Sequence, residues 1–199
     1  MSKELFDGLK GRRTYYGISK EKVVSEDIIN GIIKDAVKYT PSSFNSQSAR
    51  VVLLLDNQHD RLWDITMEAL RKVVPAEDFQ STQDKINSFK SGYGTVLFYE
   101  DQDVIESLQN NFELYKDNFP VWSLQSSGML QLVVWTGLEN EGLGASLQHY
   151  TELIDEDVKK EWNIPSNWKL LAQMPFGKQA VQPGEKQFNI LEEHIRVLK

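Results

Sequence analysis

Two kinds of hydrophobic pattern run along this chain, one with helical spacing and one of short continuous runs. Apolar positions three and four residues apart predict amphipathic helices, because such positions share one face of a helix. Short apolar runs bounded by turn residues predict buried strands. Together the patterns predict helices at about 3–9, 26–39, 61–72, 79–90, 120–140 and 155–162, a further helix capped by Asp101, and strands at 51–55, 95–99 and 168–174.

The helix that follows Ser25 has the clearest amphipathic pattern. Ser25 is a favourable N-cap residue, and Glu26 and Asp27 place negative charge in the first turn, where the helix dipole stabilises it. The apolar positions recur with helical spacing and predict one stripe that faces the core: Ile28, Ile29, Ile32, Ile33, Ala36 and Val37.

The segment from Pro120 to about Asn140 is apolar over much of its circumference. A proline at its start suits the first turn of a helix. Its apolar residues include Leu124, Met129, Leu132, Val133, Trp135 and Leu138. A helix that is apolar nearly all round is buried, and in a chain of 199 residues a partner subunit can supply part of that burial.

Composition is typical of a globular protein, with 40% hydrophobic and 26% charged residues. The length predicts a single domain over residues 1–199. A net charge of -7 disfavours nucleic acid and anionic membranes as partners. No run approaches the roughly 18 apolar residues of a membrane span, and the first residues lack the apolar core of a secretion signal. The expected location is therefore the cytoplasm.

Cysteine and histidine usage restricts the possible chemistry. The absence of cysteine excludes disulfides, a thiolate nucleophile and a cysteine-ligated metal. His59 lies in a polar segment, residues 56–60, that reads as a turn, and no partner has metal-ligand spacing. We therefore interpret His59 as a solvated turn residue and predict no metal site. A P-loop is absent, and Gly142-x-Gly144 lacks the third glycine of a Rossmann fingerprint.

Uncharged polar side chains are concentrated between Thr40 and Arg50, just before the predicted strand 51–55. Ser, Asn and Gln donate and accept hydrogen bonds without carrying charge, as a polar ring edge or a ribityl chain would require. From composition alone, a solvated loop after a helix that ends before Pro41 is the more common interpretation.

The order of these residues favours a binding loop. Pro41-Ser42-Ser43-Phe44-Asn45-Ser46-Gln47 resembles the Pro-Ser-Ser-x-Asn-x-Gln signature of the nitroreductase family of FMN-dependent oxidoreductases. The resemblance implies a nitroreductase-like α+β fold, with a mixed, mainly antiparallel central sheet flanked by helices, in an intertwined homodimer. It also implies that the loop reaches the FMN held mainly by the other subunit, through Ser42, Ser43, Asn45 and Gln47.

Basic residues near both ends of the chain are candidates for the FMN phosphate, since Arg offers multidentate donors for phosphate oxygens. On spacing alone, residues 11–17 read equally well as a solvated basic turn. The family has an Arg-x-Ser-x-Arg/Lys pattern after its first helix. The resemblance implies that Arg12, Arg13, Thr14 and Tyr16 bind FMN, although Tyr16 replaces the last basic residue of the pattern. It also implies that a basic residue near the C-terminus completes the phosphate site, with Lys186 as first choice and Lys178 as second. Phe188 stands where other members often have Arg.

Further residues are implied to lie along the flavin ring. Lys85 is the nearest match to a family Lys or Asn at the pyrimidine edge, where a cation stabilises charge that develops on reduction; a solvated helix Lys is an equal interpretation. Gln148 and His149 lie in the segment beside N5, and their sequence resembles the fatty-acid-repression-like subgroup of bacteria and yeast. Phe119 and Trp122 either wall the substrate pocket or belong to the core.

The activity implied by the resemblance is that of an FMN-dependent NAD(P)H oxidoreductase. NAD(P)H would pass hydride to flavin N5, and the reduced flavin would reduce a small-molecule oxidant, a nitroaromatic or a quinone, in a ping-pong cycle. No catalytic side chain is required, because the cofactor carries the chemistry. One alternative is a flavin-binding regulatory protein, linked to redox state or fatty acids, with incidental turnover. Another is a dimer that has lost flavin, for which the departures at Tyr16 and Phe188 are the only support.

Overall fold

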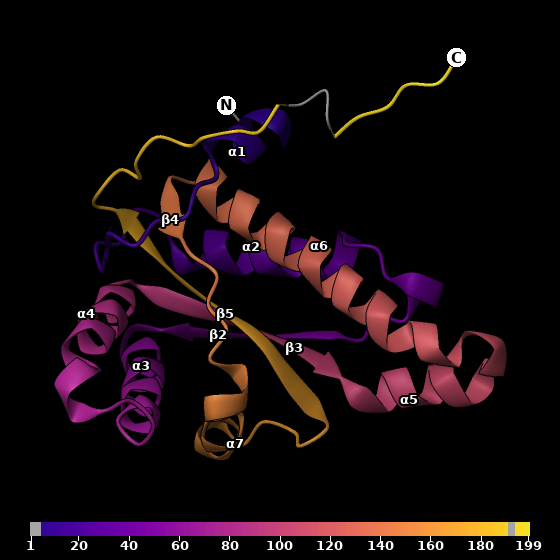
Figure 1. The fold of residues 1–199 in the computed structure, drawn as a ribbon, viewed down its shortest axis with the longest axis horizontal. Helices are drawn as coiled ribbons and strands as arrows, with labels where there is room; N and C mark the ends of the chain where they lie inside the picture. The colour runs from indigo at the N-terminus through magenta and orange to yellow at the C-terminus, as the bar shows by residue number, and fades with distance from the viewer. Residues whose placement is uncertain (1–4, 191–193) are drawn as a thin grey trace.

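A five-stranded sheet forms the centre of the protein in the computed structural model, which describes residues 5–190 and 194–199 (Figure 1). The strands run in the order β1-β5-β3-β2, and β4 pairs with β5 beside β1. Every pair of these strands is antiparallel. Their bounds are β1 Ile18–Ser19, β2 Ala49–Leu55, β3 Gly94–Asp101, β4 Leu143–Ala145 and β5 Trp168–Gln179.

Seven α-helices are present in the described part of the chain, with short 3-10 turns between some of them. The helices are α1 Leu5–Gly11, α2 Glu26–Tyr39, α3 Asp56–Leu70, α4 Phe79–Lys90, α5 Gln102–Asn111, α6 Phe119–Asn140 and α7 Thr151–Trp162. The 3-10 turns are η1 Ser43–Asn45, η2 Ala76–Asp78 and η3 Glu113–Asn118. The sequence patterns therefore predicted the type of most elements correctly.

The helices cover both faces of the sheet (Figure 1). On one face, α2 and α6 pack against Val96 and Phe98 of β3. On the other, α3, α4 and α7 pack against Leu97 and Tyr99 of the same strand. Because successive strand residues point to opposite faces, a strand buried on both sides needs an unbroken apolar run. The run in β3 has this form, and the predicted α+β architecture with a mainly antiparallel sheet is confirmed.

The α2 helix confirms its predicted cap but has a narrower buried stripe than predicted. Ser25 is the N-cap residue, and its hydroxyl accepts a hydrogen bond from the Ile28 backbone N–H at 3.4 Å. Ile29 and Ala36 are buried as predicted, but Ile28 and Val37 are 42% and 41% exposed. The prediction for these last two residues was wrong within a single chain, because six apolar positions span more of the helix than the sheet and α6 can cover.

Residues 56–60 form the first turn of α3, not the predicted solvated turn. Asp56 has a left-handed backbone (φ 49), which lets the chain pass from β2 directly into the helix. His59 is therefore fully buried, with Nδ1 2.8 Å from Thr95 Oγ1 and Nε2 3.3 Å from the Lys90 carbonyl oxygen. Local polarity misled the prediction, because hydrogen-bond partners distant in sequence satisfy this buried imidazole.

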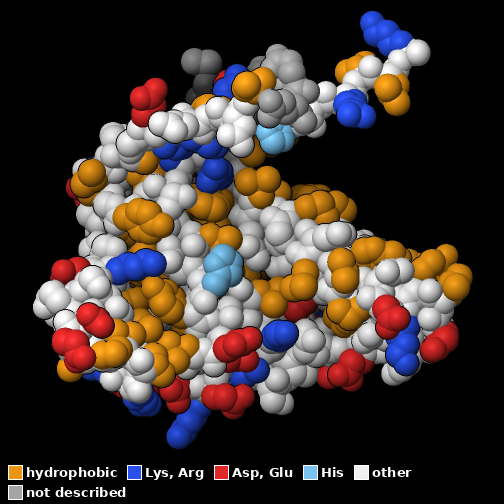
Figure 2. All heavy atoms as spheres, in the orientation of Figure 1, with side chains coloured by type: hydrophobic (Ala, Val, Ile, Leu, Met, Phe, Trp, Pro, Cys, Tyr) orange, Lys and Arg blue, Asp and Glu red, His pale blue; other side chains and the backbone are white. Residues whose placement is uncertain are grey.

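Helix α6 is buried on only one side of this chain. Leu130, Val134 and Leu138 are at most 2% exposed, whereas Leu132 and Val133 are 44% and 46% exposed. Apolar side chains gather on the surface over the α6 and α5 end of the molecule (Figure 2). The predicted helix is confirmed, but within one chain it is buried along its inner face alone, and its outer apolar face is uncovered. No helix in the described ranges is both long and apolar enough to cross a membrane.

Candidate functional site

The N-terminal loop lies beside the segment that follows β5. Arg13 Nη2 donates a hydrogen bond to the Gly184 carbonyl oxygen at 2.6 Å. The backbone N–H groups of Ala180 and Val181 donate to the Gly17 carbonyl oxygen at 2.9 and 3.1 Å. These contacts join segments that are far apart in sequence; Arg13 and Gly184, for example, are separated by 171 positions. The structure therefore brings the two predicted sources of positive charge, one at each end of the chain, into the same region.

Three cations of this region have no acidic partner in the part of the chain that the structure describes. Within residues 5–190 and 194–199, no carboxylate forms an ion pair with Arg12, Arg13 or Lys186, although the chain has 29 acidic residues. The Arg12 guanidinium lies over the Trp135 ring, 4.4 Å from its centroid, and the Lys186 ammonium lies 5.0 Å from the Phe188 ring. A ring face attracts a cation without using its N–H donors, so the donors remain available for an anion.

The same loop runs along the segment predicted to lie beside the flavin ring. Thr14 forms a parallel bridge with Ala145, and the Tyr15 N–H donates to the Ala145 carbonyl oxygen at 2.9 Å. Gln148 follows and exchanges backbone hydrogen bonds with Gln173 at 2.8 and 2.9 Å. The Gln148 side-chain amide donates to Ser146 Oγ at 3.0 Å. Gln148 is thus buried and held in place, whereas the next residue, His149, is exposed.

Tyr16 and Lys85 meet at a shared aromatic residue. The Tyr16 and Phe89 ring centroids are 6.2 Å apart, and Lys85 Nζ lies 6.0 Å from the Phe89 ring. Both Tyr16 and Lys85 are exposed. Eight of the predicted residues therefore form one neighbourhood, here called the cationic group: Arg12, Arg13, Thr14, Tyr16, Lys85, Gln148, His149 and Lys186.

The loop after α2 forms a second, separate neighbourhood. The backbone N–H of Gln47 donates to Ser42 Oγ at 2.9 Å and closes the loop. Phe44, Asn45 and Gln47 all have left-handed backbones, with φ of 57, 51 and 49. Such angles are uncommon for residues other than glycine and often occur at binding sites. The neighbourhood, here called the loop group, contains Ser42, Ser43, Asn45 and Gln47.

An aromatic cluster joins the loop group to the beginning of α6. The Phe44 ring centroid lies 5.2 Å from that of Phe119 and 6.1 Å from that of Trp122. Phe112 and Tyr115 are also in contact with Phe44, at 5.0 and 5.9 Å. Phe119 is only 2% exposed, so within this chain Trp122 offers more surface to a substrate than Phe119 does.

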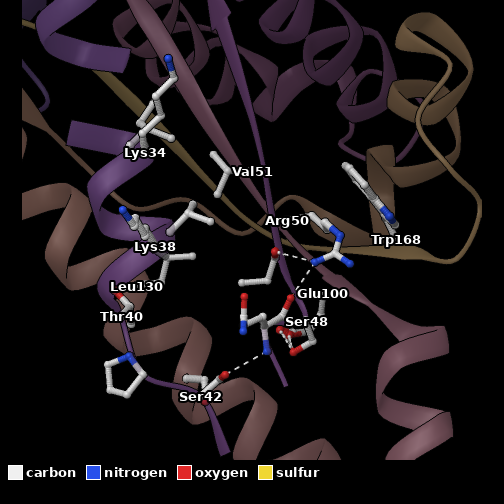
Figure 3. Close-up of a pocket in the computed structure, with 16 residues that line it drawn as sticks. Lys34, Lys38, Thr40, Ser42, Ser48, Arg50, Val51, Glu100, Leu130 and Trp168 are labelled. Atoms are coloured by element: carbon white, nitrogen blue, oxygen red, sulfur yellow. Dashed lines mark hydrogen bonds between the residues drawn. The ribbon is translucent and has the colours of Figure 1, made fainter. Parts of the chain in front are cut away.

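A cavity of about 520 Å³ adjoins the loop group (Figure 3). Lys34 and Lys38 of α2 lie on one side of it, with Arg50 and Trp168 on the opposite side. Apolar residues of α2, β2 and α6 complete its wall, among them Ile33, Val37, Val51 and Leu130. The cavity therefore combines an apolar surface with three cations, a combination that suits an aromatic or apolar molecule with an acidic or polar group.

Glu100 is a buried carboxyl group in the wall of this cavity. It is 1% exposed, and Ser48 Oγ lies 3.1 Å from each of its oxygens. Burial raises the pKa of Glu100 to about 7, against the opposing effects of the Ser48 hydrogen bond and the Arg50 charge. The sequence pattern did not point to Glu100, because an acid after an apolar run resembles the polar end of a strand. The missed signal was that two acids, Glu100 and Asp101, follow four apolar or aromatic residues, 96–99, without a turn residue between them.

The cationic group and the loop group lie at opposite ends of α6. Phe44 beside the loop group contacts Trp122, and Arg12 of the cationic group contacts Trp135. These two tryptophans are separated by thirteen residues of one helix, or about 20 Å at 1.5 Å per residue. One chain therefore does not gather all the predicted residues into a single pocket.

Comparisons with known proteins identify relatives over most of the chain. The sequence profile of the nitroreductase family matches residues 9–178. The nitroreductase FRM2 of Saccharomyces cerevisiae is 31% identical over 184 residues, which are 92% of this chain and 91% of FRM2. The nitroreductase CinD of Lactococcus lactis, solved in complex with chloramphenicol, is 42% identical with a TM-score of 0.91, covering 98% of this chain and all of CinD.

A more distant structure shares the fold and contains a flavin. The nitroreductase of Desulfitobacterium hafniense, solved with bound FMN, has a TM-score of 0.73 over the whole of both chains. At 13% identity this likeness concerns the fold alone. The bound FMN is a feature of that protein.

Proposed function

We propose that this chain, which belongs to the nitroreductase family, is an FMN-dependent oxidoreductase that uses NAD(P)H to reduce nitroaromatic or quinone-type compounds. Membership of the family supports a flavin-dependent oxidoreductase. The observation that carries FMN in particular is the cationic group, in which Arg12, Arg13 and Lys186 converge from both ends of the chain without acidic partners among the described residues.

The cationic group fits the phosphate of FMN. Arg12 and Arg13 are half-buried, so water would screen their attraction to a bound phosphate less than it does at a fully exposed position. Arg provides planar paired donors for phosphate oxygens, and Lys186 adds a point charge. The net charge of the protein is -7, and cations without an acidic partner among the described residues would attract an anion locally in spite of it. We assign phosphate binding to these three residues.

When bound, FMN would supply the hydride-transfer chemistry that links NAD(P)H to the oxidant in the proposed ping-pong cycle. The protein's contribution is binding and orientation. Thr14 and the Gln148–His149 backbone would line the flavin, and the hydrogen bonds between Gln148 and Gln173 hold that segment against the sheet. Lys85 would stabilise negative charge on the ring. Tyr16, exposed beside Phe89, would cover the ring edge and replace the usual cation.

A second copy of the chain completes the site in this proposal. The helix contacts of the loop group and of the cationic group lie about 20 Å apart along α6, and this separation supports a flavin that Ser42, Ser43, Asn45 and Gln47 reach from the partner chain. The uncovered apolar face of α6 offers a surface for that partner. A homodimer would thus contain two sites, each with the cationic group of one chain and the loop group of the other.

The surroundings of the loop group favour an aromatic oxidant. Trp122 is partly exposed beside Phe44, and aromatic rings stack favourably on such a surface. CinD, at 42% identity, has been solved with chloramphenicol and with 4-nitrophenol, both of which carry a nitrophenyl ring. These two observations support a nitroaromatic compound as substrate, with Trp122 and Phe119 at the wall of its pocket.

The phosphate assignment is tested by the double substitution Arg12→Ala with Lys186→Ala. Losing two charge-assisted contacts is expected to weaken FMN binding by at least about 100-fold, at roughly 1.4 kcal/mol for each factor of ten. The measurement is the dissociation constant from the quenching of FMN fluorescence. The matched control, Lys72→Ala with Lys160→Ala, removes the same charge at two exposed positions and is expected to bind FMN like the wild type. Unchanged FMN affinity in the first variant would overturn the assignment.

A further inference from the structure

We propose that Phe44 is a positioning residue, which anchors the loop group in the conformation that contacts the flavin. The proposal rests on the proposed function and goes beyond it, because it explains how this chain holds the loop in place. Phe44 occupies the variable position of the Pro-Ser-Ser-x-Asn-x-Gln signature, so the signature itself assigns it no role.

The backbone of the loop has a conformation that needs external support. Phe44 has φ 57 and ψ 21, which for a bulky L-residue is a strained, left-handed geometry. Asn45 and Gln47 are also left-handed, at φ 51 and 49. Three such residues within four positions would relax to ordinary angles in a free peptide, so the surrounding structure must hold them.

Hydrogen bonds within the loop are local and few. Asn45 N–H donates to the Ser42 carbonyl oxygen at 3.0 Å, and Ser46 N–H donates to the Ser43 carbonyl oxygen at 3.1 Å. The Gln47 N–H donates to Ser42 Oγ at 2.9 Å. These three contacts join the loop to itself. At the end of the loop, Arg50 Nη1 of β2 donates a hydrogen bond to the Gln47 carbonyl oxygen at 2.8 Å. At its centre, the Phe44 ring supplies the contacts with the body of the protein.

The Phe44 ring is in contact with aromatic residues from three successive elements. Phe112 is the C-cap residue that follows α5, Tyr115 lies in η3, and Phe119 and Trp122 lie in the first turn of α6. Their ring centroids lie 5.0 to 6.1 Å from that of Phe44. Each ring pair of this kind adds attraction beyond simple burial. The ring therefore acts as an anchor that turns the backbone of residue 44 and, with it, sets the directions of the Asn45 and Gln47 side chains.

The anchor is separate from the core that stabilises the fold. Phe44 is 50% exposed, and neither of the two apolar cores on the faces of the sheet includes it. Removing its ring should consequently free the loop without unfolding the domain. A loop that spends only a fraction of its time in the binding conformation weakens the apparent affinity by that same fraction. An affinity loss with an intact fold is the signature of this role.

The experiment compares Phe44→Ala, Phe44→Tyr and the control Leu114→Ala in the full-length protein with added FMN. Leu114 lies in η3, is 84% exposed and makes no ring contact with Phe44. We expect Phe44→Ala to weaken FMN binding about 10-fold or more, with little change in the thermal unfolding midpoint of the flavin-free protein. Phe44→Tyr keeps the ring and should restore both the affinity and the wild-type position of the visible flavin bands. Leu114→Ala should resemble the wild type.

Two results would overturn the proposal. One is a Phe44→Ala protein that binds FMN with wild-type affinity and an unchanged flavin spectrum. The other is an equal loss in Phe44→Ala and Phe44→Tyr, which would show that the ring is not the anchor. If the wild type itself takes up no FMN, the proposed function fails instead, so the two failures are distinguishable.

Discussion

At the scale of single residues, Glu100 has the most unusual electrostatic environment near the candidate site. Its carboxyl is buried in the wall of the cavity, with the Ser48 hydroxyl as its hydrogen-bond donor. Arg50 approaches from β2 but forms its ion pair with Asp101, with Nη2 2.8 Å from Oδ2. Glu100 therefore lacks a full counter-charge, and burial raises its pKa to about 7.

This raised pKa predicts a loss of stability as the pH rises from 4.5 to about 7. Below the unfolded pKa of 4.5, Glu100 is protonated in both states and costs nothing. As the pH rises from 4.5 towards 7, the Glu100 carboxyl ionises in the unfolded state before it does so in the folded state. The free energy of unfolding therefore falls, by about 3 kcal/mol once the pH exceeds 7. Glu100→Gln should therefore stabilise the protein more at pH 8 than at pH 5, as measured by urea unfolding. Wild-type and variant curves that stay parallel between these pH values would contradict the assigned pKa.

His59 provides the opposite pH dependence at the other face of the sheet. Burial lowers its pKa to about 4, so the stability associated with the neutral ring is lost as the pH falls from 6.5 through 4. Comparing Glu100→Gln with the wild type cancels this contribution, because both proteins contain His59. The difference between the two proteins isolates Glu100.

The sequence predicted residues with recognisable local patterns and missed those whose role depends on distant contacts. Arg12 and Lys186 were matched to the family by motif, and the structure brings their segments together. Glu100 and His59 were missed or misread, because their burial is produced by strands and helices far away in sequence. Burial of a polar group is a tertiary property, and local polarity alone does not reveal it.

At the scale of elements, α6 has two functions in this account. Its inner face, with Leu130, Val134 and Leu138, supports the sheet core. Its outer face exposes apolar side chains that a monomer would leave in water: Val121, Leu124, Met129, Leu132 and Val133. An exposed apolar surface of this kind typically marks a protein interface. We therefore place the proposed dimer contact on this face.

A charge on the outer face of α6 should separate the subunits. Leu132→Glu would bury an unpaired carboxylate at the interface, and twofold symmetry would place it there twice. We expect the dimer dissociation constant to rise at least about 100-fold, with loss of FMN, since each site needs both chains. Size-exclusion chromatography with light scattering gives the mass.

The matched control for this prediction is Val73→Glu, a similar change at a 63% exposed position beyond the end of α3. It should leave the mass and the FMN content unchanged. A Leu132→Glu protein with the mass and FMN content of the wild type would exclude this face from the interface.

Element types were predictable because periodicity depends on local geometry, but element boundaries were less so. Helix α4 runs from Phe79 to Lys90, as the pattern predicted. Helix α7 begins at Thr151, four residues before the predicted start, because Tyr150 N–H is held by Gln173 Oε1 rather than by a local cap. Strand β5 continues to Gln179 through Pro175, where pairing with β3 and β4 overrides the local signal to stop.

At the scale of the whole molecule, the central feature is the separation of the two groups along α6. The fold fixes the cationic group at one end of this helix and the loop group at the other. A sequence alone predicts which residues belong to the site through the family motifs, but it does not give their distances. This separation within one chain is the observation that supports the proposed two-chain site.

The most direct test of this two-chain flavin site is the FMN content of mixed dimers, measured by visible absorption. One parent protein carries Arg12→Ala with Lys186→Ala, and the other carries Ser42→Ala with Asn45→Ala. Each parent should retain little FMN. After mixing and refolding, random pairing yields mixed dimers with one intact site, or roughly one FMN for every four chains. A mixture as colourless as its parents, beside a wild type that binds FMN, would contradict the account.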